Sequence, residues 1–523
     1  MNHLTVRTRY GLLQGAEKNG VRVWRGIPYA EPPVGKLRFR APQEPMAWEG
    51  VREATQVGPI AMQPVVKDAS RMSSQASEAV RSEDCLYLNV WAPPEAEGAA
   101  EGEEKGGVGR GRGAGISFAG LKPVMVWFHG GAFVSGAGSL ALYDGTAFVE
   151  AGEVVVVTVN YRLGAFGFLH LAPFEGGLGS NLGLMDQVAA LKWVRDNIAV
   201  FGGDPERVTI FGESAGAMSI AALLAMPAAK GLFRRAILQS GASQYMPAAA
   251  AEQVAQGFLA ELGAGAGGTG VRGADSAPGQ AGVARWLESF TAEELQAAAE
   301  RLSAKLNKAG LAPMVFQPVL DGDTLPLDPV EAVRAGSAAG VELLIGTNRH
   351  EGAYFIRQGS PVLKREETVR LLCQFGFAAQ AEELAGSYET SIDGQAEMAT
   401  DLVFWGPAIR LAEAQLPHAG VWMYRFDWSQ PGHPLIGKSV HALEIMFVFD
   451  KLFYLEGLGC RIDAAAEGLA KRMQSAWIRF AASEEEDPAD WAAYEPGRRM
   501  TKVFDSEDGL ESDPHAAKRL LLV

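Results

Sequence analysis

The stretch G-E-S-A-G at residues 212–216 places a serine, Ser214, where a strand must turn directly into a helix. The residues from Val208 to Phe211 read as a strand, and strong helix formers follow the serine as far as Pro227. So short a reversal strains the middle residue and holds it beside the unpaired N–H groups of a helix start. An acyl-transfer nucleophile needs this position, although G-x-S-x-G also occurs by chance in long chains.

A serine hydroxyl is too weak an acid to attack unaided, so it needs a base and a carboxylate that holds the base in the right tautomer. His3 and His515 lie near the termini, and His129 belongs to an H-G-G turn. The remaining candidate bases are His170, His350, His418, His433 and His441. His441 stands between a polar turn and an apolar run, which predicts a loop at the edge of the core. For any one histidine, a surface or core role is the commoner interpretation.

Glu351 is the candidate carboxylate, because it follows a short apolar strand at 341–345 and a Gly-Thr-Asn turn. An acid just beyond the carboxyl end of a strand would lie on the same rim as Ser214. The chain order serine, acid, histidine is also the order that hydrolases with this turn use. Spacing alone leaves open that Glu351 is one of many solvated carboxylates.

An oxyanion formed during acyl transfer needs backbone donors. The sequence W-F-H-G-G-A-F at 127–133 ends a buried strand with two glycines and an alanine, a backbone that can turn its N–H groups toward Ser214. The N–H of Ala215, directly after the serine, is the other expected donor. Glycine-rich turns are common, so the agreement among the motifs carries the hypothesis.

The elements that must position these residues alternate as a mostly parallel sheet requires. Strands are predicted at 85–93, 123–131 and 154–162, the last two apolar enough to be buried on both faces. Apolar residues from Leu184 to Ile198 recur at helical spacing. The pattern predicts an α/β fold with helices packed on a sheet.

Composition limits the partners of this chain. Its 523 residues are 48% apolar, and 47 basic against 62 acidic residues give a net charge of −15, which argues against nucleic-acid and anionic-membrane partners. The three cysteines, Cys85, Cys373 and Cys460, are widely spaced, which indicates neither a zinc site nor a disulfide framework and favours a reduced cytoplasm. The amino terminus shows no signal-peptide pattern, and no apolar run has transmembrane length. We find no nucleotide-binding motif and no metal-spaced histidine cluster, and we expect no cofactor and no metal.

Long blocks of this chain resemble the type-B carboxylesterase family of the α/β-hydrolase fold, which includes bacterial para-nitrobenzyl esterases, carboxylesterases, cholinesterases and non-catalytic neuroligins. The blocks include G-I-P-Y-A-E-P-P-V-G-K-L-R-F, S-E-D-C-L-Y-L-N-V-W-A-P, V-M-V-W-F-H-G-G-A-F-V-S-G-A-G, G-G-D-P-E-R-V-T-I-F-G-E-S-A-G-A-M-S, G-T-N-R-H-E-G and V-H-A-L-E-I-M-F-V-F. They span nearly the whole chain, and the block around the serine is highly specific.

The resemblance implies a role for each matching residue. Ser214 would be the nucleophile, Glu351 the triad acid and His441 the general base. The oxyanion donors would be the N–H groups of Gly131, Ala132 and Ala215. Glu213 and Ser240 match family positions beside the triad, where hydrogen bonding to the acid or the histidine is expected.

The resemblance also implies one α/β-hydrolase domain over residues 1–523, with helical insertions within about 245–420 forming a pocket above Ser214. Gly-rich stretches at 95–115 and 263–282 are expected to be mobile insertions, since neither can bury enough apolar surface to offset its ordering entropy. Four aromatic residues are possible pocket residues, but ordinary core is the commoner role: Phe133, Phe316, Phe355 and Phe404.

The expected reaction is hydrolysis of carboxylic esters through an acyl-enzyme on Ser214, with short- to medium-chain or aryl and benzyl esters as the expected substrates. The resemblance does not imply cholinesterase activity, because the segment before Cys85 lacks the choline-binding Trp and the loop-closing Cys of the cholinesterases. A bacterial-type intracellular esterase fits better. A lipase, an amidase and a non-catalytic neuroligin-like binding protein stay open as alternatives, and the oligomeric state is not determined by the sequence.

Overall fold

The structure is a computed structural model that describes residues 3–65, 79–94, 120–174, 176–265, 282–308, 314–485 and 489–523. The Gly-rich stretch predicted as an insertion at 95–115 lies outside these residues. Of the stretch at 263–282, residues 266–281 also lie outside them, while its first three residues end the helix α6 (Ala248–Gly265).

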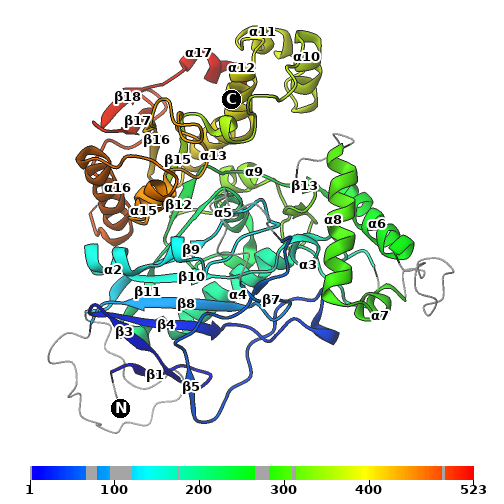
Figure 1. The fold of residues 1–523 in the computed structure, drawn as a ribbon, viewed down its shortest axis with the longest axis vertical. Helices are drawn as coiled ribbons and strands as arrows, with labels where there is room; N and C mark the ends of the chain where they lie inside the picture. The colour runs from blue at the N-terminus through cyan, green and yellow to red at the C-terminus, as the bar shows by residue number, and fades with distance from the viewer. Residues whose placement is uncertain are drawn as a thin grey trace.

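A large sheet crosses the middle of the molecule (Figure 1). Among the described residues it contains eleven strands, in the order β18-β17-β16-β15-β12-β11-β9-β10-β8-β4-β3. Their bounds are Gly509–Ser512, Met500–Phe504, Val421–Phe426, Glu342–Asn348, Arg235–Gln239, Gly203–Glu213, Lys122–Phe128, Val155–Val159, Tyr87–Ala92, Val21–Pro28 and Ala16–Lys18. Neighbours from β17 to β10 pair in parallel, and the strands at both edges pair antiparallel. The prediction of a mostly parallel sheet is confirmed.

Smaller strand pairs lie outside this sheet. β1 (Thr5–Arg7), β2 (Leu12–Gln14) and β5 (Val51–Glu53) form one group, β6 (Ile60–Ala61) pairs with β7 (Arg81–Ser82), and β13 (Met246–Pro247) pairs with β14 (Val319–Leu320). The strand predicted at 123–131 ends early, at Phe128, because Gly131 takes a φ of 116° that no extended strand allows. The residues beyond it form a turn.

Helices cover both faces of the sheet, as predicted. Along β9, Val126 and Phe128 face one core, while Met125 and Trp127 face another. The first core contains α3 (Gly164–Phe168), α4 (Leu182–Asn197) and α5 (Ala215–Ala225). The second contains α2 (Thr146–Ala151), α14 (Ile445–Val448), α15 (Phe453–Gly457) and α16 (Ala464–Ala482). Two apolar faces per strand explain the nearly continuous apolar runs in the sequence.

Between β12 and β16, most of the residues that the structure describes are helical, as predicted for the insertions. The helices after α6 are α7 (Val283–Glu288), α8 (Ala292–Lys308), α9 (Pro329–Arg334), α10 (Arg365–Gln374), α11 (Ala381–Gly386), α12 (Ile392–Thr400), the π-helical turn η8 (Asp401–Trp405) and α13 (Gly406–Gln415). Figure 1 shows α6 to α8 gathered at one side of the sheet and α10 to α12 at the top, beside the C-terminal helix α17 (Ala516–Leu522).

A buried ion pair fastens α4 to the segment that follows β10. Arg162 donates to Asp186 Oδ1 over 2.6 Å and to Oδ2 over 2.8 Å, and both side chains are almost completely buried. The backbone N–H of Arg162 donates to the same carboxylate. Because three donors from one residue satisfy this carboxylate, the pair orients α4 against the sheet.

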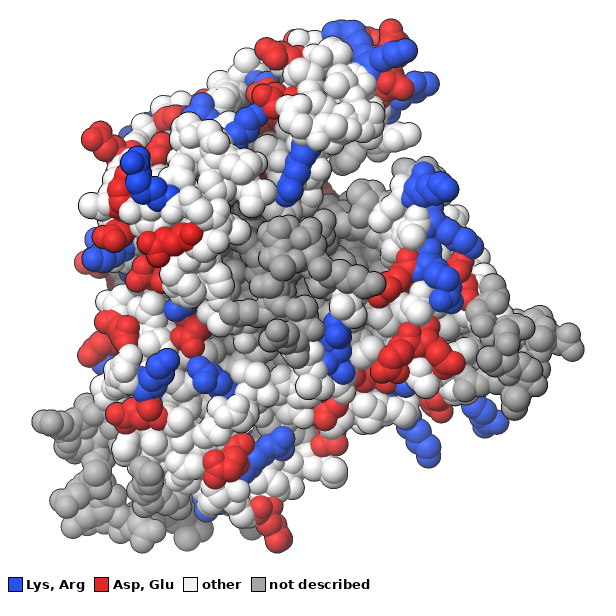
Figure 2. Space-filling view, in the orientation of Figure 1, with Lys and Arg blue, Asp and Glu red and all other residues white. Residues whose placement is uncertain are grey.

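Charged side chains of both signs are interspersed over the face drawn in Figure 2, without a large area of one sign. Within the described ranges, no helix is long and apolar enough to cross a membrane.

Candidate active site

Ser214 lies at the tip of a tight turn between β11 and α5, with φ 53° and ψ −121°. A non-glycine residue pays about 1–3 kcal/mol for such a backbone conformation, so the surroundings must hold it. They do so from both sides: the N–H of Ser214 donates to the carbonyl of Gln239 over 2.9 Å, and its carbonyl accepts from the N–H of Met218 over 2.8 Å. The turn therefore has the strain that the sequence predicts.

Two glycines allow the strand and helix to meet around this serine. A Cβ atom on Gly216 would overlap the carbonyl oxygen of Phe128 on the neighbouring strand, and one on Gly212 would lie 2.6 Å from the same oxygen. Gly130 is equally confined, since its Cβ would lie 2.6 Å from Glu213 Oε2. Only hydrogen fits at these positions, which explains the glycines of the motif.

His441 and Glu351 form a direct contact at the same edge of the sheet. His441 Nδ1 lies 2.6 Å from Glu351 Oε2, and both side chains are buried. Glu351 begins the 3₁₀ turn η7 (Glu351–Tyr354) just after β15, and its Oε1 accepts from the backbone N–H of Asn348 over 2.6 Å. This arrangement holds the imidazole by one nitrogen and leaves the other, Nε2, for proton transfer.

The other imidazole nitrogen faces Glu213. His441 Nε2 lies 3.1 Å from Glu213 Oε1, while within the described residues no hydrogen bond joins Ser214 to His441. Hydrogen bonds of catalytic groups are often loose before substrate binds, so this geometry does not oppose a role for Ser214. It does place two carboxylates against one histidine.

The pKa values of this cluster follow from burial and charge. Burial alone would lower the pKa of His441, but the charges of Glu213 and Glu351 raise it to about 9. Burial raises the pKa of Glu213 to about 8, against the opposing charge of His441. Because the two groups compete for a proton near neutral pH, they titrate as a pair.

A third buried carboxylate, Glu444, completes the network. It accepts from Asn348 Nδ2 over 2.6 Å and from Gln239 Nε2 over 3.2 Å, and Trp477 Nε1 donates to Gln239 over 2.9 Å. Burial and the charge of Glu351 raise the pKa of Glu444 to about 7. Glu444 is not among the predicted site residues, although it follows His441 by three positions, where a turn of helix would place it on the same side.

Ser240 lies at the end of β12 with φ 52°, and its N–H donates to the carbonyl of Gly346 over 2.8 Å. Its hydroxyl is buried and makes no hydrogen bond within the described residues. The structure therefore places Ser240 beside β15, the strand that precedes Glu351. The expected hydrogen bond from its side chain to the acid or the histidine is not formed.

The turn after β9 offers free backbone donors. Gly131, Ala132 and Phe133 have φ values of 116°, 54° and 62°. In the described part of the chain, no acceptor takes the N–H groups of Gly131, Ala132 or Ala215, and Ala215 is the first residue of α5. Three donors without acceptors beside a strained serine suit an oxyanion.

Aromatic rings line the region next to His441. The rings of Phe404 and Phe355 lie 4.8 Å and 5.2 Å from the imidazole, centroid to centroid, and stack on each other at 6.1 Å. Phe355 is 56% exposed, so the expectation that it is ordinary core is wrong; it ends a 3₁₀ turn that leaves one side open. Phe133 and Phe316 are fully buried core residues.

The remaining histidines lie in other settings. His129 is buried against the ring of Tyr161 at 4.4 Å, and burial lowers its pKa to about 4. His170 contacts Ser180, while His418 and His433 contact backbone carbonyls. No group of residues within the described ranges has the composition of a metal site.

The fold and this site define the class of the protein: an α/β-hydrolase with a serine at the turn after a central strand and a histidine–carboxylate pair beside it. The model of the carboxylesterase family matches residues 2–514, and the chain belongs to this family. It is 45% identical to the para-nitrobenzyl esterase of Bacillus subtilis over 99% of this chain and 98% of that protein. It is 34% identical to the phenmedipham hydrolase of Pseudarthrobacter oxydans, covering 90% and 88%. A solved thermophilic PNB esterase is 44% identical over 100% of both chains, with a TM-score of 0.87.

Membership of this family, together with 45% identity to a para-nitrobenzyl esterase over nearly the full length of both chains, identifies the protein as a carboxylic ester hydrolase. The predicted class, an α/β-hydrolase that hydrolyses esters, is confirmed by the family match and by the solved relatives.

Proposed function

We propose that Ser214, His441 and Glu351 are the nucleophile, general base and acid of this esterase. The observation that carries the proposal is the 2.6 Å contact between His441 and Glu351 at the sheet edge where Ser214 occupies its strained turn. Three pieces of chain that are far apart in sequence meet there. A non-catalytic binding protein would have no need of this constellation.

In the proposed first step, the ester carbonyl carbon is attacked by Ser214 Oγ, whose proton passes to His441 Nε2. For this transfer, Nε2 exchanges its neighbour Glu213 for Ser214. The carbonyl oxygen gains the negative charge and accepts hydrogen bonds from the N–H groups of Gly131, Ala132 and Ala215. Collapse of this intermediate breaks the bond to the alcohol, which receives the proton from His441.

The acyl group then remains on Ser214 as an ester. A water molecule gives its proton to His441 Nε2 and attacks the acyl carbon, and the same backbone donors hold the second oxyanion. The bond to Ser214 breaks, the serine recovers its proton from His441, and the carboxylic acid leaves. Glu351 keeps the imidazole in the required tautomer and stabilises its cationic form in both steps.

We infer an aromatic or short-chain alcohol portion in the substrate. The exposed face of Phe355 and the neighbouring ring of Phe404 offer an apolar, flat surface directly beside His441, the group that would protonate the leaving alcohol. One relative is named for para-nitrobenzyl esters, whose alcohol portion is aromatic. The cysteines have free thiols, and a cytoplasmic, bacterial setting stays a prediction.

Initial rates on p-nitrophenyl esters from acetate to palmitate, with Ser214→Ala as control, test this proposal. Fast turnover of short and medium chains, absent in the variant, is the expected result. A rate that rises toward palmitate would favour a lipase, and turnover of p-nitroanilides at a similar rate would favour an amidase. Full activity in Ser214→Ala would exclude the assigned nucleophile.

A further inference from the structure

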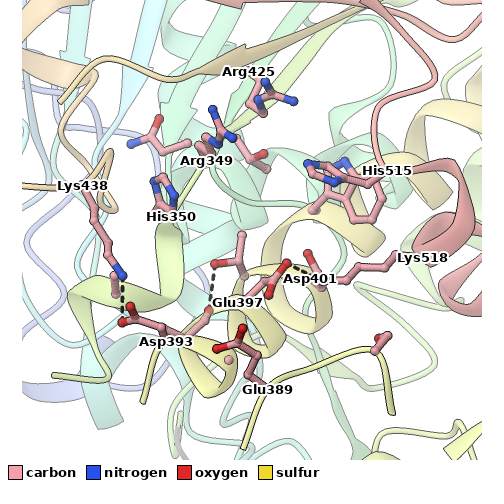
Figure 3. Close-up of a pocket in the computed structure, with 18 residues that line it drawn as sticks. Arg349, His350, Glu389, Asp393, Glu397, Asp401, Arg425, Lys438, His515 and Lys518 are labelled. Carbon is pink, nitrogen blue, oxygen red and sulfur yellow. Dashed lines mark hydrogen bonds and ion pairs between the residues drawn. The ribbon is translucent and has the colours of Figure 1, made fainter. Parts of the chain in front are cut away.

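A cavity of about 470 Å³ lies beside the end of β15 and η7, and His441 is not among the residues that line it. Its walls come from the end of β15, from α12, from η8 and from the C-terminal helix α17, and its lining is rich in charge (Figure 3). Cavities of this volume suit small molecules. The proposed ester chemistry does not use this cavity, so the inference below goes beyond that function and does not depend on it.

The charges of the cavity are separated by sign. In Figure 3, Arg349, His350 and Arg425 lie along one side, and Asp393 and Glu389 lie along the opposite side. Lys438 and Lys518 stand at the two flanks. Basic and acidic side chains therefore face each other across the cavity.

Most of these charges are already neutralised within the protein. Arg425 is held by Asp427 and Glu511 in two bidentate pairs. Lys438 pairs with Asp393 over 2.8 Å, and Lys518 pairs with Glu397 and Asp401. These residues build the walls but have little binding capacity left.

Two groups on one side and one group on the other keep their capacity to bind. Arg349 donates from one terminal nitrogen to Asp427 over 3.1 Å, and its half-exposed guanidinium has further N–H donors. Beside it, His350 Nδ1 is buried and has no hydrogen-bond partner within the described residues. On the opposite side, Glu389 is exposed, and its carboxylate forms no ion pair or hydrogen bond with any described residue.

We propose that this cavity binds a small zwitterion, an amino acid or a short peptide. The ligand carboxylate lies against Arg349 and His350 Nδ1, and the ligand ammonium lies against Glu389. An anion would pair with Arg349 and the buried imidazole nitrogen but not with Glu389, and a cation would leave that buried nitrogen without a partner. A ligand with both charges pairs with all three groups, and a cavity of about 470 Å³ has the size of a small-molecule site.

A ligand in this cavity would contact the segment around Glu351, the proposed triad acid. Thr347, Asn348 and Ala353 line the cavity and flank Glu351 in sequence. The N–H of Gly352 donates over 3.0 Å to the hydroxyl of Thr400, another lining residue. The bound zwitterion would therefore rest on the turn that fixes Glu351.

Isothermal titration of the full-length protein tests the proposal with alanine, dialanine and trialanine. We expect saturable binding of at least one member at or below about 1 mM, equivalent to roughly 4 kcal/mol. N-acetylation or C-terminal amidation of that member should weaken binding at least tenfold, and both together should abolish it. No saturable binding by any member overturns the proposal, as does equal binding of the doubly capped peptide.

Two variants locate the charges. In Glu389→Gln, N-acetylation of the peptide should not weaken binding further, because the variant has lost the partner of the amine. In Arg349→Gln, C-terminal amidation should not weaken binding further, because the variant has lost the partner of the carboxylate. Glu383→Gln and Arg370→Gln change exposed residues outside the cavity and should bind like the unchanged protein. Unchanged affinity in both cavity variants would place the bound peptide elsewhere and refute the assignment. Thermal unfolding of each variant verifies the fold.

Discussion

The pair of carboxylates on His441 predicts an unusual pH dependence, which Glu213→Gln should reveal. His441 Nε2 lies 3.1 Å from Glu213 Oε1, and both side chains are buried. Coulomb's law gives about 1.3 kcal/mol for unit charges at this distance with the dielectric constant of water, and about 5 kcal/mol with a value of 20. Because one pKa unit equals 1.36 kcal/mol, these energies correspond to a pKa shift of about 1–4 units. The pKa shifts measured for opposite charges in contact are about 1–3 units.

The sign follows from the charge that the variant removes. His441 has a pKa raised to about 9 and is active as a base only when neutral, so activity is lost as the pH falls through this value. Glutamine keeps the shape of Glu213 but no longer stabilises the imidazolium. The pKa of His441 should therefore fall, and the acid limb of kcat/KM should move to lower pH by about 1–3 units.

The assay measures kcat/KM for a p-nitrophenyl ester between pH 5 and pH 10. This range includes the pKa of His441, about 9, and the lower values expected in the variant. Glu444→Gln is the matched control, since Glu444 is also buried but contributes less to the pKa of His441 than Glu213 does. Its acid limb should move less. An acid limb that stays in place in Glu213→Gln, or moves to higher pH, would refute the reasoning, provided that thermal unfolding shows an intact fold.

Three further variants test the site and its support. Glu351→Gln should lower kcat by about 10⁴-fold with little change in KM, because the imidazole loses its orienting charge; a loss of less than tenfold in steady-state assays would contradict the assigned acid. Gly216→Ala should destabilise the protein by about 1–3 kcal/mol or prevent folding, since the methyl group would overlap the carbonyl of Phe128, and an unchanged thermal midpoint would disprove this. Asp186→Asn should cost about 3–5 kcal/mol of unfolding free energy in urea, because Arg162 would stay buried without its counter-charge; a cost below about 1 kcal/mol would show that water reaches the guanidinium.

Much of the α/β fold could be predicted from the sequence, because its strands and its central turn have local patterns of apolar and small residues. Apolar runs that are buried on both faces identified β9 and β10, and the small residues around Ser214 identified the turn between β11 and α5. Steric exclusion makes these signals strong, since a larger side chain at Gly216 has no space. For Glu351 and His441, the residues alone left alternatives, and the family resemblance selected them.

The missed features depend on contacts between distant segments. Glu444 meets Gln239 and Asn348 only after three strands have aligned, and no local pattern marks a buried carboxylate. The orientation of His441 toward Glu213 is likewise a property of packing. Phe355 reads as core because its type is apolar, whereas its exposure results from the open end of η7. Sequence periodicity has no information on such arrangements.

The placement of α16 near the end of the chain has a consequence for synthesis on the ribosome. One face of β9 and β11, with Met125, Trp127 and Phe211, belongs to the core that α16 covers. The helix α2 precedes β11 and contacts part of this face through Phe148. Since chains are made from the N-terminus at about 5–20 residues per second, the rest of the face stays uncovered while more than 200 further residues are added, roughly 10–50 seconds, until α16 is complete. During this interval the nascent chain exposes apolar surface on one face of β9 and β11. This face is where a chaperone that binds apolar surface would act.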